Sequence, residues 1–87
     1  MASCRLLLKA SAVKEIEKVG SKGDRRRIVE NTRRLADDPR GPGSEKLAGY
    51  EDRYRVRQGD YRIVYLIDDK ATTVTVYKVG HRRDVYR

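Results

Sequence analysis

Apolar and polar residues alternate in two runs between Tyr50 and Tyr65, and the pair Gly59-Asp60 separates these runs. Tyrosine and β-branched residues favour strands, and a glycine followed by an aspartate suits the two-residue turn of a β-hairpin. The pattern therefore predicts a hairpin whose turn also sets the register of its strands. In that register the opposing pairs are Gln58 with Tyr61, Arg57 with Arg62, Val56 with Ile63, Arg55 with Val64, and Tyr54 with Tyr65.

Side chains alternate across a strand, so this register sorts the residues of the hairpin onto two faces. One face is apolar and consists of Tyr54, Val56, Ile63, Tyr65 and Ile67. The other face has three arginines, followed by two apolar residues: Arg55, Arg57, Arg62, Val64 and Leu66. Like charges directly opposite each other destabilise a sheet, so the Arg57–Arg62 pair needs a reason, and a polyanion lying across this face would supply one.

The N-terminal residues predict a short strand and then a helix. The strand is expected over Arg5–Lys9, and the apolar spacing favours a helix over Ala12–Val19. Ser11 has the side chain of a helix N-cap, and Gly20 suits a left-handed cap at the other end.

A second helix is expected between Ser21 and Asp38. It opens with Ser21–Asp24, which resembles a capping box, and it closes before Pro39 because the residue before a proline is pushed out of the helical region. Its inner stripe is Ile28, Thr32 and Leu35. Its outer face consists of Arg25, Arg26, Arg27, Arg33 and Arg34, for which a solvated surface is the simpler interpretation and contact with a partner the alternative.

The rest of the chain predicts one more strand after the hairpin. Residues 40–44 are expected to form a loop, and residues 45–49 to lead from it into the hairpin. Thr72–Val79 is the third strand of a meander, and Gly80 is expected to end it. Strand, helix, helix and a three-stranded antiparallel meander predict one two-layer α+β domain over residues 1–87, with the helices on the apolar sheet face and the arginine face open.

The composition adds a strong positive charge to this picture. The net charge is +8 in a chain that is 39% charged, which indicates a nucleic acid, a membrane surface or an acidic protein as partner, or a solvated basic surface. A single cysteine, Cys4, rules out an internal disulfide and a cysteine-based metal cluster and fits a reducing cytoplasm. No apolar run approaches the roughly 20 residues of a membrane span, so we expect a cytoplasmic protein with no membrane partner.

The side chains available restrict the possible chemistry. The sequence has one histidine, no Ser/His/Asp arrangement and no phosphate-cradling glycine loop, so we expect neither a metal nor a cofactor. Arginine, histidine and tyrosine suit metal-free cleavage of RNA, in which the 2′-hydroxyl attacks the adjacent phosphate and cations hold the developing charge. Arginine matches two phosphate oxygens at once, and tyrosine stacks on an unpaired base.

Four motifs resemble the RelE toxins of bacterial type II toxin–antitoxin systems over nearly the whole chain. They are Leu47-Ala48-Gly49, Tyr54 to Arg57, Gly59 to Tyr65, and Gly80 to Tyr86. The resemblance implies a compact, microbial-ribonuclease-like endonuclease that enters the A site of the 70S ribosome, cuts mRNA there and is held inactive by a RelB-like antitoxin.

The resemblance also implies roles for individual residues. The implied catalytic residues are Arg57, Arg62, His81, Arg82 and Tyr86. The implied RNA-binding residues are Arg55, Arg57, Arg62, Arg82 and Arg83. Tyr86 is expected to stack on the base, and His81 matches the catalytic histidine of the YoeB-like branch.

The identity of the general base stays open at this point. Some RelE toxins have lysines where this chain has Arg55 and Arg57, and an arginine effectively cannot lose its proton. His81 is the leading candidate because its unperturbed pKa is near ~6.5. Glu45 and Glu51 are close in sequence but are unassigned.

Two alternative functions remain. The ParE relatives share the architecture but act on DNA gyrase, and a basic module that binds RNA without cutting it is the other possibility. The His81, Arg82 and Tyr86 cluster favours the nuclease branch.

Overall fold

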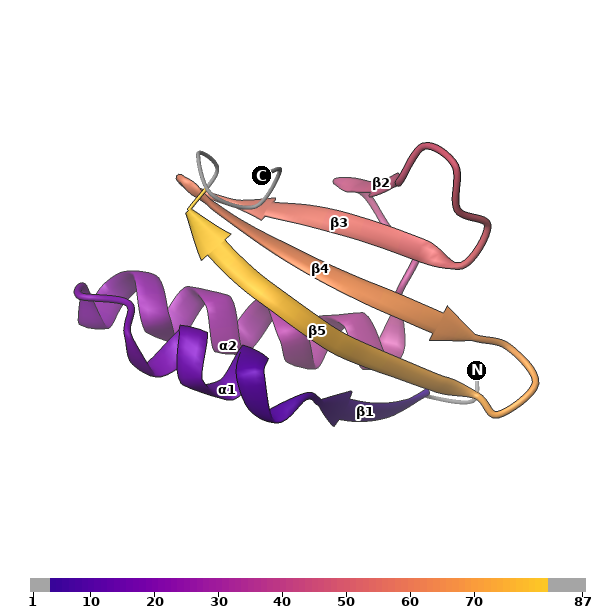
Figure 1. The fold of residues 1–87 in the computed structure, drawn as a ribbon, viewed down its shortest axis with the longest axis horizontal. Coiled ribbons are helices and arrows are strands. Elements are labelled where there is room, and N and C mark those ends of the chain that lie inside the picture. Colours follow the sequence, from indigo (N-terminus) through magenta and orange to yellow (C-terminus); the bar gives the residue numbers. More distant parts are fainter. Residues whose placement is uncertain (1–3, 82–87) are drawn as a thin grey trace.

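A five-stranded mixed sheet lies against two helices in the computed structural model, which describes residues 4–81 (Figure 1). Arg82, Arg83 and Tyr86 lie outside the described residues. The elements in chain order are β1 (Arg5–Leu8), α1 (Ala10–Glu17), α2 (Lys22–Asp37), β2 (Ser44–Lys46), β3 (Arg53–Gln58), β4 (Tyr61–Asp68) and β5 (Thr73–His81).

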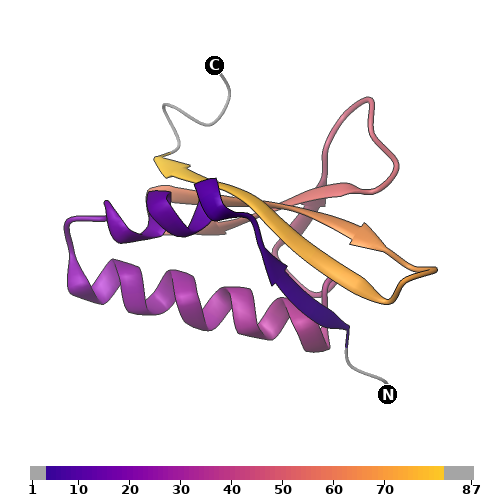
Figure 2. The same cartoon turned by 60° about the horizontal axis from the view of Figure 1, so that its bottom comes forward.

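The strand order in the sheet is β1-β5-β4-β3-β2. β3, β4 and β5 form the predicted antiparallel meander, and β1 adds to its edge in parallel to β5. Figure 2 shows both helices on the same side of this sheet, which confirms the two-layer α+β prediction. The predicted hairpin register is also confirmed, including the Arg57–Arg62 pair.

The core fills the space between the helices and the sheet. Ile63, Tyr65 and Ile67 of β4 are buried there, as the alternation predicted. The predicted inner stripe of α2 faces them, with Ile28 fully buried and Thr32 donating a hydrogen bond from its hydroxyl to the Val29 carbonyl at 2.6 Å. Tyr54 of β3 lies at the margin of this core and stacks on Tyr65, with 5.9 Å between ring centroids.

The helix ends differ from the sequence prediction in α1 and agree with it in α2. Ser11 is not the N-cap of α1, because the helix starts at Ala10 and Lys9 takes the capping position without a side-chain hydrogen bond. Gly20 is not a left-handed cap, because α1 ends at Glu17 and its C-cap, Lys18, has right-handed geometry. Ser21 does cap α2, since its hydroxyl accepts a hydrogen bond from the Asp24 amide at 3.3 Å.

Two strand predictions were wrong. Ser44, expected in the loop, and residues 45–46, expected only to lead into the hairpin, form β2, which pairs with β3 so that Glu45 lies opposite Arg55. Gly80 does not end β5, because the strand continues to His81 and Gly80 pairs with Arg62. Residues 44–46 and Gly80 gain their strand conformation by pairing with a neighbouring strand, which the local sequence does not encode.

The β4–β5 ladder contains an irregularity. Val64 pairs with Lys78 and Tyr65 pairs with Val76, so Tyr77 is an extra residue of β5 at that step. The extra residue changes which of the following side chains face the core, so that Val79 rather than Lys78 is buried. Tyr77 itself follows the buried Val76 and lies on the sheet face away from the helices, where the Arg53 guanidinium carbon is 5.4 Å from its ring centroid.

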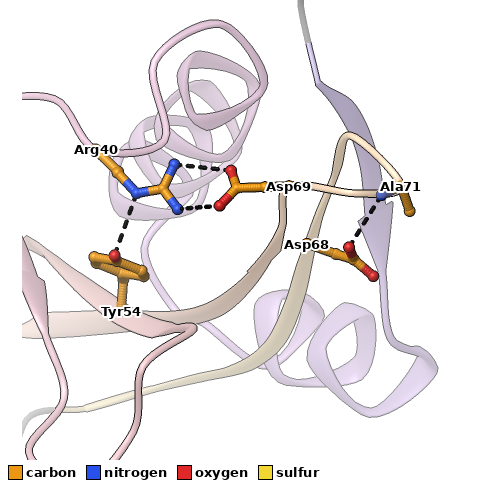
Figure 3. A network of polar contacts seen from close by, with 5 residues as sticks. All are labelled: Arg40, Tyr54, Asp68, Asp69 and Ala71. Carbon is orange, nitrogen blue, oxygen red and sulfur yellow. Dashed lines mark hydrogen bonds and ion pairs between the residues drawn. The ribbon is translucent and has the colours of Figure 1, made fainter.

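A polar network connects the loop after α2 to the start of β3 and to the turn after β4 (Figure 3). The Arg40 guanidinium donates two hydrogen bonds to the Asp69 carboxylate, at 3.1 and 2.9 Å, and a third to the Tyr54 hydroxyl at 3.2 Å. These bonds lower the pKa of Asp69 and raise that of Arg40. In the adjoining turn, the Ala71 amide donates to the Asp68 carboxylate at 3.0 Å. The network holds the start of the loop that leads into β2.

Candidate nucleic-acid interface

Three arginines meet on the sheet face that the helices leave open. Arg55 and Arg57 come from β3 and Arg62 comes from β4, and together with Gly43 and Glu45 they line a shallow cavity of about 260 Å³. The structure thus brings together the hairpin residues predicted to bind RNA. Their spacing follows from the strand alternation and from the tight turn, which sets Arg57 directly opposite Arg62.

Glu45 is the residue of this cavity whose role the sequence left unassigned. Its carboxylate accepts two hydrogen bonds from the Arg55 guanidinium, at 2.7 Å from one terminal nitrogen and 3.2 Å from Nε. The hydrogen bond from Arg55 lowers the pKa of Glu45, and the charges of Arg55 and Arg62 lower it further. Glu45 therefore stays ionised at neutral pH, beside the cations.

The other two arginines bond to neutral backbone carbonyls. Arg57 donates from Nε to the Gly59 carbonyl at 3.1 Å, and Gly59 has a φ of +59°, which favours glycine at this turn position. Arg62 donates to the Tyr61 carbonyl at a longer 3.4 Å. These contacts orient the two guanidinium groups without neutralising them. Three cations and one carboxylate line the cavity, so it has an excess of positive charge that suits a phosphate.

His81 is one residue beyond Gly80, the strand partner of Arg62, but it does not line the cavity. It pairs with Tyr61 at the end of β5, and the two rings meet edge to face with 5.7 Å between centroids. Tyr61 packs against the core, so its strand neighbour Arg62 points to the opposite face. The predicted contributions of Arg82, Arg83 and Tyr86 concern residues outside the described range.

Neither a metal centre nor a membrane span is found in the described part of the chain. Between residues 4 and 81 no three side chains of His, Cys, Asp or Glu are grouped so as to hold a metal ion. In the same range no helix has the length and apolar character needed to cross a membrane.

Fold and site together define a small α+β protein with a basic, arginine-lined sheet face. A family model described as the ParE toxin of type II toxin–antitoxin system, parDE, matches residues 6–86. The protein therefore belongs to this family of type II toxins, within the RelE/ParE superfamily.

Individual relatives point to the RelE side of this superfamily. Toxin RelG of Mycobacterium tuberculosis is 46% identical over 46 residues, which cover 53% of this chain and about half, 49%, of RelG. The isolated E. coli RelE toxin is 31% identical, with a TM-score of 0.78 over 97% of this chain and 92% of RelE. The toxin–antitoxin complex RelBE2 of M. tuberculosis contains a chain that is 26% identical, with a TM-score of 0.79 over 92% of this chain and 99% of its own. The predicted resemblance to RelE toxins is confirmed.

Proposed function

We propose that this toxin is an endoribonuclease that cuts messenger RNA in the ribosomal A site. The observation that carries the proposal is the cavity on the open sheet face, where Arg55, Arg57 and Arg62 lie around the carboxylate of Glu45. Phosphate-binding cations and a proton acceptor are two of the elements that metal-free RNA cleavage needs, beside an acid for the leaving 5′-oxygen. The similarity to RelE toxins supports the same function.

The reaction begins with the 2′-hydroxyl of one nucleotide attacking its own 3′-phosphate. A new 2′-oxygen–phosphorus bond forms as the bond to the 5′-oxygen of the next nucleotide breaks, giving a 2′,3′-cyclic phosphate and a 5′-hydroxyl. A base takes the proton of the 2′-hydroxyl, and an acid supplies one to the 5′-oxygen. Arg57 and Arg62 bind the non-bridging oxygens, whose negative charge rises in the transition state.

Glu45 is the candidate for the base because it lines the cavity and is ionised. Arg55 holds the carboxylate in place and keeps it deprotonated before the substrate arrives. His81 remains the alternative base that the resemblance predicts. It pairs with Tyr61, whose side chain lies on the opposite face of the sheet from Arg62. Arg82 and Tyr86 keep their predicted roles, the first at the phosphate and the second in stacking on the base.

Dependence on the ribosome is consistent with a site on the open sheet face. The cavity of about 260 Å³ lies on that face, and a flexible message would lie there in many orientations. A message held in the A site has its phosphates and 2′-hydroxyls already ordered, which converts a loose encounter into a near-attack geometry. We expect the toxin to work in the cytoplasm, where translating ribosomes are.

An antitoxin is the proposed second partner. Several solved structures that resemble this chain are toxin–antitoxin complexes, among them RelBE2 of M. tuberculosis and RelBE of E. coli. An acidic or amphipathic segment of a RelB-like protein complements the positive charge of the open face. Such a segment inhibits the toxin by covering Arg57 and Arg62.

A second candidate function is inhibition of DNA gyrase. It is favoured by one observation, the family model whose description names ParE toxins. In that case the arginine cavity would bind an acidic surface or DNA and would cut no RNA.

Primer extension on translated messages after induction of the toxin separates these functions. Cuts within codons at the A site, lost in Arg62→Ala, are expected from the nuclease. Gyrase-dependent DNA damage with intact messages would instead support the second candidate, and RNA binding without either effect would indicate a non-catalytic module.

A further inference from the structure

A second cluster of cationic and aromatic side chains lies on the same open sheet face, away from the arginine cavity. It lines a shallow cavity of about 280 Å³ with Lys9, Arg53, Leu66, Thr75 and Tyr77. Arg53 and Arg57 lie on the same face of β3 and are separated by four residues, roughly 13 Å along the strand. The two cavities therefore lie on the same open face of the sheet, within reach of neighbouring nucleotides of one strand.

Arg53 is the centre of this cluster. Its guanidinium carbon lies 4.5 Å from the ring centroid of Tyr50 and 5.4 Å from that of Tyr77. These are distances of cation–π contacts, which hold the guanidinium in place while leaving its N–H groups to bond elsewhere. The Nε atom is buried and has no hydrogen-bond partner within residues 4–81. A buried donor of this kind is rare and costs free energy, so the hydrogen bonding of Arg53 within residues 4–81 is incomplete.

The alternation of β5 creates this arrangement. Val76 is buried in the core, so Thr75 and Tyr77 on either side of it face the open side of the sheet, beside Leu66 of β4. The resulting surface combines a half-buried aromatic ring, an apolar wall and two cations. Aromatic rings beside cations are what single-stranded RNA requires, since bases stack on the rings and phosphates pair with the cations.

We propose that this cluster is a subsite for a second nucleotide of the same RNA strand, bound beside the nucleotide that is cut. The proposal rests on the proposed nuclease function and extends it. The phosphate accepts hydrogen bonds from Arg53 and Lys9, and the base packs on Tyr77 and Leu66. RNA is favoured over a protein ligand because the cluster lies on the same open sheet face as the arginine cavity and is also positively charged.

Binding of 2′-O-methyl oligoribonucleotides of increasing length to the purified toxin tests the subsite, since these probes cannot be cut. We expect a step in affinity at the length that reaches both cavities. Arg53→Gln and Tyr77→Leu should each remove this step, weakening the longer probes about tenfold, whereas Tyr77→Phe, which keeps the ring, should retain it. Arg53→Gln should also lower the slope of log affinity against log salt by about 0.7.

Arg33→Gln on the outer face of α2 is the matched control, because it removes the same charge from the opposite layer. Thermal unfolding of every variant identifies those that fail to fold. If Tyr77→Leu is destabilised, the Arg53→Gln result decides. A length series without a step, or a step that survives Arg53→Gln, would overturn the subsite. Loss of antitoxin binding in Arg53→Gln with an unchanged RNA series would overturn it as well, and would assign the cluster to the protein partner.

The same set of variants keeps this proposal separate from the proposed function. Cuts in translated messages are scored in the parent protein and decide the nuclease function alone. If the toxin cuts messages but shows no step in affinity with length, the nuclease function is supported and the subsite is contradicted. A toxin that has the step without cutting any message retains the subsite as an RNA-binding feature and loses the nuclease.

Discussion

Glu45 and Arg55 face each other across β2 and β3, with 2.7 Å between the carboxylate oxygen and the nearer guanidinium nitrogen. This contact places the acidic side chain of the cavity among its three arginines. It also explains why the pKa of Glu45 is lowered, since the hydrogen bond from Arg55 stabilises the charged form.

The first prediction concerns Glu45 as the base. Glu45→Gln keeps the size and the hydrogen-bonding capacity of the side chain but removes the proton acceptor. Cleavage of a ribosome-bound message should fall by about a hundredfold or more, as is typical on loss of a general base. Glu51→Gln, a change at another exposed glutamate outside the cavity, should leave the rate unchanged. If Glu45→Gln cuts at the parental rate while His81→Gln does not, the base is His81.

The second prediction concerns the opposed pair of Arg57 and Arg62. Replacing Arg57 by glutamine removes a like-charge contact across the hairpin, so the free energy of unfolding should rise by about 0.5 kcal/mol or less. The same variant should inhibit growth less than the parent, because a phosphate ligand is lost. Denaturant unfolding and growth after induction measure the two effects. A variant that loses stability would show that the two guanidinium groups are not in conflict in the absence of RNA.

The third prediction uses the buried hydroxyl of Tyr65. This hydroxyl donates to the Pro39 carbonyl at 2.6 Å, and Tyr65→Phe leaves that acceptor without its bond. The free energy of unfolding should fall by about 1 kcal/mol. Tyr54→Phe, whose hydroxyl bonds the exposed Arg40, should have a smaller effect. Urea unfolding of the two variants at neutral pH gives the comparison, and equal losses would contradict it.

The same tyrosine predicts a loss of stability in alkali. Burial raises the pKa of Tyr65 from 10.0 to about 12. A raised pKa of an acid means that the neutral form is favoured by folding, so this contribution is complete below pH 10 and is lost as the pH rises through about 12. Tyr65→Phe cannot ionise at this position and should lose less stability than the parent over that range. Alkaline titrations of the ultraviolet absorbance of the parent and of Tyr65→Phe should differ by one tyrosine that ionises near pH 12.

The fourth prediction concerns the Arg40–Asp69 ion pair. Asp69 is exposed, so its contribution is small, and Asp69→Asn should lower the melting temperature by only a few degrees at neutral pH. Because Arg40 lowers the pKa of Asp69, the contribution is present above about pH 4 and is lost as the pH falls through the lowered pKa. The difference between parent and Asp69→Asn should therefore vanish in acid. A difference that persists there would mean that the carboxylate charge is not what stabilises the loop.

The hairpin could be predicted residue by residue from the sequence because its turn and its alternation are local signals. Gly59 allows the turn, and the period of two then assigns Arg57 and Arg62 to one face. The capping of α2 by Ser21 is local in the same sense. These features account for most of the fold and for the arginine part of the site.

The features that were missed depend on distant parts of the chain. β2 consists of Ser-Glu-Lys, which has no apolar period, and it is a strand only because β3 provides a partner. Glu45 could not be assigned to the site without it. The strand extends through Gly80 because pairing with Arg62 overrides the weak strand propensity of glycine. The bulge at Tyr77 similarly depends on how β5 pairs with β4, where Val64 pairs with Lys78 and Tyr65 with Val76.

The central claim is tested most directly with purified ribosomes that hold a defined codon of a short message in the A site. The parent toxin should produce one cut in that codon, leaving a 2′,3′-cyclic phosphate, and a single 2′-deoxy substitution at the attacking nucleotide should abolish the cut. Arg62→Ala should have no detectable activity on the same complex. An intact message with the parent toxin, or a cut that survives the 2′-deoxy substitution, would contradict the account.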